Sequence, residues 1–163
     1  MRNTKLLKFG VGFLSCFAQY TLHCSGRTAP SPDYPSGRQT VRTTAFSDAH
    51  RAAAKNAKGA RLRSGQVKSA AADWSRFPLG TKFRVLPTNQ TYVVDDYGPA
   101  LVGTNTIDLY MSSRQEMARW GVRQVTIDII EAGSYEKSLS LLKARKKTPY
   151  VRQMVTGLRK KVQ

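Results

Sequence analysis

The chain has 163 residues and a formal net charge of +17 at pH 7, which leaves room for one domain with extensions and favours anionic partners. Its two cysteines, Cys16 and Cys24, lie near the N-terminus, and its only histidines are His23 and His50. This composition excludes a cysteine zinc site and a disulfide framework from the rest of the chain, as well as a Ser-His-Asp triad. Any chemistry must therefore use carboxylates, hydroxyls or lysines.

Residues 1–25 have the pattern of an export signal, because a basic start precedes an apolar stretch that ends near Leu22. The alternative is a mitochondrial-type or soluble amphipathic helix, and a lipid anchor at Cys16 is a weaker interpretation. Residues 26–40 are rich in proline, which predicts a linker without helix or sheet. We expect an exported protein in the periplasm, in the cell envelope or outside the cell.

Short stretches rich in β-branched and apolar residues predict a β domain over residues 41–132. The predicted strands span residues 41–47, 66–72, 82–86, 90–94, 106–110 and 122–130. Pro87, Thr88 and Asn89 predict a hairpin turn between the third and the fourth of these strands. The segment 50–60 is basic and has no apolar stripe, so it is predicted to be a solvated insertion.

Helices are predicted only towards the end of the chain. Ser112 or Ser113 can cap a short helix that buries Met117 and Trp120 and ends at Gly121. Residues 133–163 form a basic tail with two predicted helices on either side of Pro149. The second helix has an apolar stripe at helical spacing, listed as Val151, Met154, Val155 and Leu158. This tail either packs on the barrel or binds an anionic membrane surface or envelope polyanion.

Four of the ten acidic residues lie within residues 73–108, a stretch otherwise made of predicted strands and glycine turns, namely Asp73, Asp95, Asp96 and Asp108. Alternation along a strand puts Asp108 on the face opposite Ile107 and Leu109. The glycines in the same region permit turns and the close approach of a ligand. Three interpretations stay open at this point: an acid–base site, aspartates that cap turns, and a calcium or magnesium site.

Glycosidic cleavage is one reaction that such a cluster suits. A carboxylic acid must deliver a proton to the leaving oxygen, and it does so near neutral pH only if its pKa is raised. Burial and a second nearby carboxylate both raise that pKa. If the sugar's own 6-hydroxyl attacks, no catalytic water is needed, and one acid that later acts as a base is sufficient.

A set of motifs in the order of the chain resembles the 3D domain, a family named for three aspartates. The matching segments are Thr44-Ala45-Phe46, Ala72-Asp73 with Pro78-Leu79-Gly80-Thr81, Asp96-Tyr97-Gly98 through Gly103, Ile107-Asp108-Leu109-Tyr110, and Trp120-Gly121-Val122-Arg123-Gln124-Val125. The resemblance spans about residues 41–130. The sequence departs from the family pattern at Trp74, Tyr97, Pro99, Val102 and Thr106, and it lacks the large accessory domain of the murein transglycosylases that carry this barrel.

The resemblance implies a mainly β fold, a six-stranded double-psi β-barrel, followed here by the basic helical tail. It implies that Asp108 is the catalytic acid and base, that Asp96 supports it, and that Asp73 completes the cluster. The same resemblance implies a groove-lining role for Thr44. We further expect Asp95, Tyr97, Gly98 and Gly103 to line the substrate groove.

The sequence thus predicts an exported protein that cleaves peptidoglycan glycan strands as a lytic transglycosylase, without a cofactor or a metal. One rival hypothesis is a peptidoglycan-binding module without catalysis. A second rival, suggested by the charge of +17, is a nucleic-acid-binding barrel. The export signal and the acidic groove argue against nucleic acid as a partner.

Overall fold

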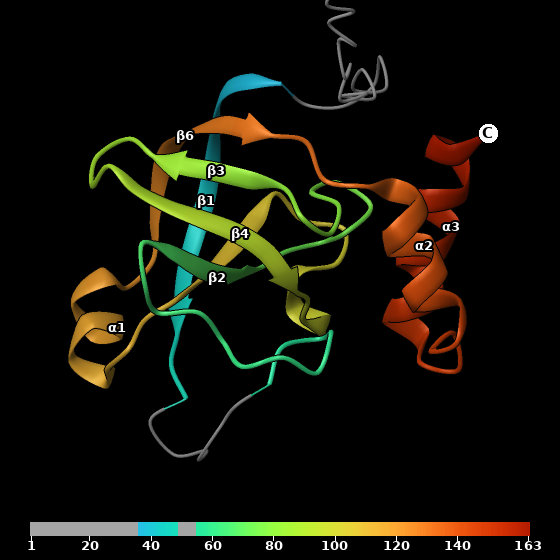
Figure 1. The fold of residues 1–163 in the computed structure, drawn as a ribbon, viewed down its shortest axis with the longest axis horizontal. Coiled ribbons are helices and arrows are strands. Elements are labelled where there is room, and N and C mark those ends of the chain that lie inside the picture. The colour runs from blue at the N-terminus through green and yellow to red at the C-terminus, as the bar shows by residue number, and fades with distance from the viewer. Residues whose placement is uncertain (1–35, 49–54) are drawn as a thin grey trace, which may run out of the picture.

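The computed structural model describes residues 36–48 and 55–163, and six strands in these ranges close into a barrel (Figure 1). The order around the barrel is β1-β5-β2-β4-β3-β6. The strands are β1 (Gly37–Phe46), β2 (Val67–Ala71), β3 (Lys82–Val85), β4 (Gln90–Asp96), β5 (Thr106–Tyr110) and β6 (Arg123–Glu131). The predicted mainly β fold with six strands is confirmed. The predicted export signal and most of the predicted linker lie outside the described residues.

The barrel combines parallel and antiparallel pairs. Strand β1 is parallel to β5, and β2 is parallel to β4, whereas the other four pairs are antiparallel. The hairpin between β3 and β4 turns at Asn89, whose φ of 55° is a left-handed conformation that asparagine tolerates. Because each strand contacts a partner on both sides, the barrel exposes no long unpaired strand edge.

The barrel is filled by side chains that alternate along the strands. Ile107 and Leu109 are fully buried, while Asp108 between them faces away from the core, as the alternation predicts. Two large aromatic side chains from the loop after β2, Trp74 and Phe77, join the same core. They extend it from the barrel towards the C-terminal helices.

The short helix α1 (Arg114–Trp120) begins at its predicted cap, because the Ser113 side chain accepts a hydrogen bond from the Glu116 N–H. It ends at Gly121, whose φ is 61°. The prediction that Met117 and Trp120 are buried needs correction. Both are only half-buried, because α1 covers one end of the barrel and is open to solvent on its other sides.

The tail forms two helices, α2 (Tyr135–Lys143) and α3 (Pro149–Val162), that pack on each other beside the barrel (Figure 1). The apolar stripe of α3 is buried in the same core as the barrel, with exposures of 5% or less. The packing of the tail on the barrel is therefore observed, while binding of an anionic surface or polyanion by its basic face stays a prediction. Gly133, between β6 and α2, lets the backbone lie close to the turn at Pro78, since a Cβ at Gly133 would lie 2.3 Å from the Pro78 carbonyl oxygen.

One strand boundary and one loop segment differ from the sequence-based expectation. Strand β1 begins at Gly37, four residues before Val41, because its first residues pair with β6. The described part of the segment 50–60 is anchored rather than fully solvated, since Asn56 is buried. Among the described residues, no helix has both the length and the apolar character needed to cross a membrane.

Candidate active site

A cleft of about 520 Å³ lies against the outer faces of β1, β2 and β5 and is closed on one side by the turn that follows β4. Asp96 and Asp108 both line it, together with Thr44, Tyr97 and Gly98. Five of the eight predicted site residues are therefore in one cavity. The other three, Asp73, Asp95 and Gly103, do not line it.

Strand register explains why the two cleft aspartates lie in the same cavity. Ala71 at the end of β2 is paired with Asp96 of β4 on one side and with Asp108 of β5 on the other. A register shift between Ala70 and Ala71 aligns Asp96 with this position. The small side chain of Ala71 lies between the two acids and leaves the cleft open above it.

Asp108 is half-buried and has a specific partner on β1. The Thr44 hydroxyl donates to Asp108 Oδ1 over 2.6 Å, because Thr44 and Asp108 are directly paired in the parallel β1–β5 register. Burial raises the pKa of the Asp108 carboxyl above its ordinary value, and the hydrogen bond from Thr44 partly offsets this. A carboxyl held in this way retains its proton to higher pH than an exposed aspartate.

Asp96 ends β4 and accepts a hydrogen bond from the Tyr97 N–H over 2.9 Å. Burial raises the pKa of the Asp96 carboxyl, the Tyr97 N–H lowers it, and the neighbouring charge of Asp95 raises it again. The expected repulsion between the cleft acids is not the cause. The like charge comes from Asp95, on the opposite face of the same strand.

Tyr97 is fixed by aromatic contacts that connect the cleft to the helices. Its ring packs edge-on against Trp74 at 4.9 Å between centroids, and it lies 6.3 Å from the ring of Tyr150 in α3. Arg145, between the two tail helices, donates to the Tyr97 hydroxyl over 3.2 Å. Trp74 also donates from Nε1 to the Asp96 carbonyl oxygen over 2.9 Å, so this departure from the family pattern supports the cleft.

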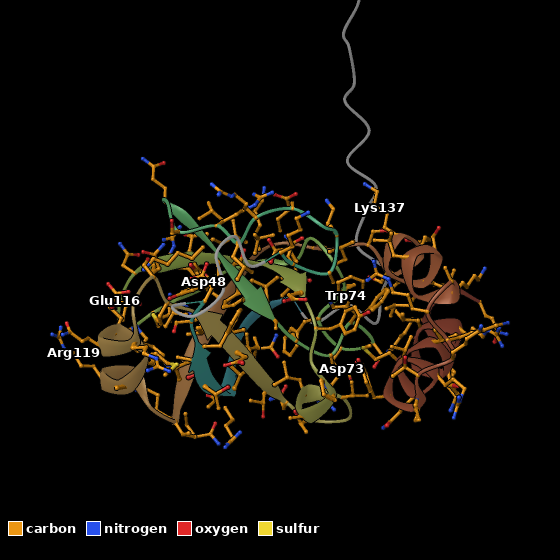
Figure 2. The ribbon with its side chains drawn as sticks, turned by 90° about the horizontal axis from the view of Figure 1, so that it is seen from below. Asp48, Asp73, Trp74, Glu116, Arg119 and Lys137 are labelled. Carbon is orange, nitrogen blue, oxygen red and sulfur yellow. The ribbon has the colours of Figure 1, made fainter. Side chains whose placement is uncertain are left out.

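The structure does not bring Asp73 to the cleft. Asp73 is 2% exposed, and its Oδ1 accepts hydrogen bonds from the N–H and the hydroxyl of Ser75. Its Oδ2 accepts from the Gly103 N–H over 2.7 Å. Figure 2 shows it beside Trp74, on the side of the barrel nearer to the helices. Asp73 therefore caps the turn at Ser75 and links it by a hydrogen bond to the turn at Gly103. Turn capping was one of the interpretations that the sequence left open.

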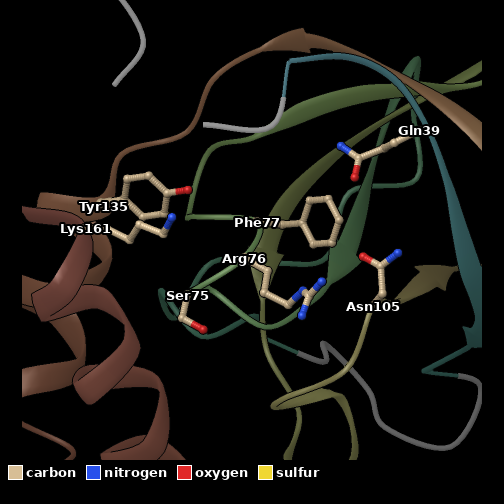
Figure 3. Close-up of a pocket in the computed structure, with 7 residues that line it drawn as sticks. All are labelled: Gln39, Ser75, Arg76, Phe77, Asn105, Tyr135 and Lys161. Carbon is tan, nitrogen blue, oxygen red and sulfur yellow. The ribbon is translucent and has the colours of Figure 1, made fainter. Parts of the chain in front are cut away.

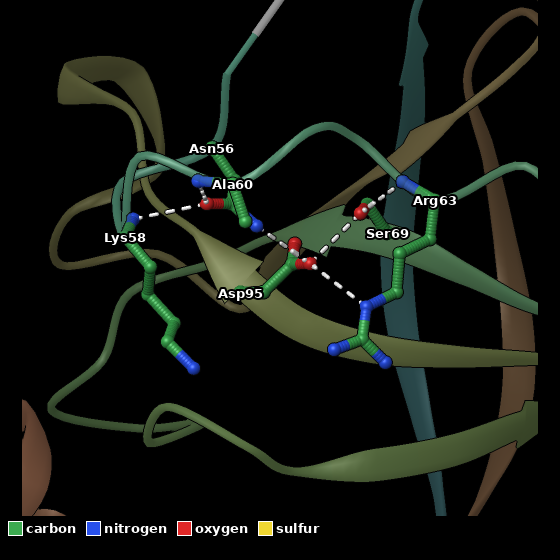
Figure 4. A network of polar contacts seen from close by, with 6 residues as sticks. All are labelled: Asn56, Lys58, Ala60, Arg63, Ser69 and Asp95. Atoms are coloured by element: carbon green, nitrogen blue, oxygen red, sulfur yellow. Dashed lines mark hydrogen bonds and ion pairs between the residues drawn. The ribbon is translucent and has the colours of Figure 1, made fainter.

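Asp95 is also structural (Figure 4). It is 4% exposed, and its Oδ2 accepts hydrogen bonds from Ser69 over 2.8 Å and from Asn56 over 3.0 Å. Arg63 lies 3.8 Å from the same oxygen. Burial raises the pKa of the Asp95 carboxyl, while Ser69 and Asn56 lower it. This network holds the loop before β2 against β4, so the expectation that Asp95 lines the groove needs correction.

The two glycines have different roles. Gly98 lines the cleft with an extended backbone, whereas Gly103 has a φ of +79° and donates its N–H to Asp73. Gly103 is therefore required by the turn. Sequence reasoning missed Arg42, which lines the cleft and lies 3.5 Å from the Thr106 hydroxyl through Nη1. Strand alternation could have found it, since Arg42 precedes Thr44 by two residues.

In the described ranges, no group of three or more His, Cys, Asp and Glu side chains is placed to hold a metal ion. The cleft itself offers two acids, a hydroxyl and an arginine, namely Asp96, Asp108, Thr44 and Arg42.

Comparison with known proteins adds one finding. Residues 68–131 match the family model described as the 3D domain, a range that includes Asp73, Asp96 and Asp108 but not Thr44. No curated protein matches the chain. The chain therefore carries a 3D domain within its barrel.

Proposed function

We propose that this protein is an exported peptidoglycan-remodelling enzyme that cleaves glycan strands by a lytic transglycosylase reaction. The observation that carries the proposal is the pairing of Asp96 and Asp108 across Ala71 at one open cleft. The association of the 3D domain family with cell-wall proteins supports the choice of substrate. We further propose the double-psi topology for the barrel.

In the proposed reaction, protonated Asp108 donates its proton to the glycosidic oxygen, and the bond from that oxygen to the sugar C1 breaks. The 6-hydroxyl of the same sugar then bonds to C1, and its proton returns to Asp108. The products are a 1,6-anhydro sugar end and a new free hydroxyl. Water is not consumed, so the mechanism needs one acid that also acts as a base.

The other cleft residues have supporting roles in this proposal. The Thr44 hydroxyl orients Asp108 and stabilises its charged form after proton donation, because it donates to Oδ1. Asp96, if charged, stabilises positive charge that develops at C1. Arg42, which is exposed at the cleft, attracts the acidic groups of the polymer.

The test is product analysis by mass spectrometry after incubation of the purified protein with sacculi. Wild-type protein is expected to release 1,6-anhydro-muropeptides, and Asp108→Asn is expected to release none. Arg84→Gln is a matched surface control, because Arg84 is exposed on β3 and does not line the cleft. Equal product from Asp108→Asn would remove Asp108 from the mechanism. Binding to sacculi without any product would support the non-catalytic binding module instead.

A further inference from the structure

A second cavity, of about 290 Å³, lies where the barrel meets the tail helices, and we call it the seam pocket (Figure 3). Gln39 of β1 and Asn105 lie on its barrel side, whereas Tyr135 and Lys161 come from the helices. Arg76 and Phe77 lie between them, on the turn that Asp73 caps. The helices lie outside the residues that match the 3D domain, so this pocket combines that domain with the chain's own tail.

The lining of the seam pocket is suited to a negative charge. Arg76 and Lys161 contribute two cationic groups, and none of its lining residues in the described part of the chain is acidic. The Arg76 side chain is exposed and available for a ligand. A guanidinium group offers parallel N–H donors that match the two oxygens of a carboxylate.

A buried donor in the same pocket is the second indication. Gln39 Nε2 is inaccessible to solvent and has no hydrogen-bond partner among the described residues. Buried amide N–H groups are nearly always paired, since an unpaired one is costly. A turn of the Gln39 side chain, which lines the pocket, would bring this donor to an oxygen of a bound ligand. The buried ring of Phe77 forms an apolar surface beside it, which suits a small methyl group.

We propose that the seam pocket binds a carboxylate of a short peptide. If the function proposed above holds, that carboxylate belongs to the peptide stem of the glycan strand bound in the cleft. The two cavities share a neighbouring stretch of chain, because Asn105 lines the seam pocket and the next residue, Thr106, lines the cleft. Consecutive Cα atoms are about 3.8 Å apart.

The test uses the full chain and N-acetyl-D-alanyl-D-alanine as the probe, with its C-terminal amide as the neutral counterpart and inorganic phosphate as the other oxyanion. NMR titration of the Gln39 side-chain amide and the Arg76 guanidinium is expected to show saturable shifts with the carboxylate and none with the amide. Arg76→Gln is expected to weaken binding about tenfold, as loss of a charge-assisted hydrogen bond predicts. The exposed control Arg84→Gln should leave binding unchanged.

A second variant, Gln39→Met, keeps the side-chain volume and removes the unpaired donor, so it should weaken binding while the protein stays folded. Absence of saturable shifts, equal loss in Arg84→Gln, or tighter binding of phosphate than of the dipeptide would each overturn the proposal. The titration is repeated with Asp108→Asn, which should bind the dipeptide normally. Failure of this site is thereby distinguished from failure of the proposed catalysis.

Discussion

Asp73→Asn is predicted to destabilise the protein while leaving the cleft chemistry in place. The Asp73 carboxylate uses both of its oxygens, Oδ1 for the N–H and hydroxyl of Ser75 and Oδ2 for the N–H of Gly103. An asparagine has only one oxygen. If that oxygen keeps the Ser75 contacts, the amide N–H₂ faces the Gly103 N–H, and a buried donor meets another donor.

The magnitude follows from these contacts. A hydrogen bond to a charged group contributes about 1.5–3 kcal/mol, and a buried donor left unpaired costs a similar amount. Asp73→Asn should therefore lower the free energy of unfolding by about 2–3 kcal/mol. Asp73→Ala loses all three hydrogen bonds and should lower it by about 4 kcal/mol. For a chain of this size each kcal/mol corresponds to about 2–4 °C in Tm.

Urea unfolding and thermal unfolding measure this loss, and Asp108→Asn is the matched control. It makes the same chemical change at a half-buried acid, where Asn Oδ1 can still accept from the Thr44 hydroxyl. We expect its stability to differ from wild type by less than about 1 kcal/mol. Asp73→Asn should therefore lose stability, whereas Asp108→Asn should stay stable and lose product release from sacculi.

The opposite pattern would refute this reasoning. If Asp73→Asn unfolds like wild type yet releases no product, then Asp73 takes part in the reaction and its buried contacts are not its main role. Unfolding is measured at pH 7, and product release is compared at a temperature where both variants are folded.

Three further predictions concern single contacts. Thr44→Val removes the hydrogen bond that lowers the pKa of Asp108, so the alkaline limb of the pH–rate profile should move to higher pH; movement to lower pH would contradict this role. Burial raises the pKa of Asp95 in the folded protein above its ordinary value of 3.8. The protonated carboxyl therefore contributes stability that is fully present below pH 3.8 and is lost as the pH rises through the folded-state pKa. Asp95→Asn should consequently show a smaller fall in unfolding free energy from pH 4 to pH 7 than wild type, and an equal or larger fall would be inconsistent with this assignment. Gly133→Ala should cost about 1–3 kcal/mol in urea unfolding, because the new Cβ would lie 2.3 Å from the Pro78 carbonyl oxygen; an unchanged midpoint would mean that this approach is not rigid.

The strands and helix caps could be predicted from the sequence because their signals are local. Alternation identified β5 and the outward position of Asp108, and the pair Ser112 and Ser113 identified the start of α1, which Ser113 caps. The start of β1 at Gly37 could not be predicted in this way. Its first residues form a strand because β6 pairs with them, and pairing between distant segments leaves no local signal.

The candidate site was predicted in part for the same reason. Asp96 and Asp108 share one cavity because two strand registers converge on Ala71, which a family pattern can indicate but local sequence cannot. Asp73 and Asp95 are of the same residue type as the two cleft acids, yet each is buried in its own hydrogen-bond network. The direction of a side chain at a strand end or turn depends on these long-range contacts.

The most direct test of the account is a carbon-13 NMR titration of the Asp108 carboxyl in the folded protein. The account predicts a titration midpoint above the ordinary aspartate value of 3.8, because burial in the cleft favours the protonated acid, and a further rise in Thr44→Val. A midpoint at or below 3.8 in wild-type protein would contradict it, since Asp108 would then be an ordinary ionised carboxylate with no proton to donate.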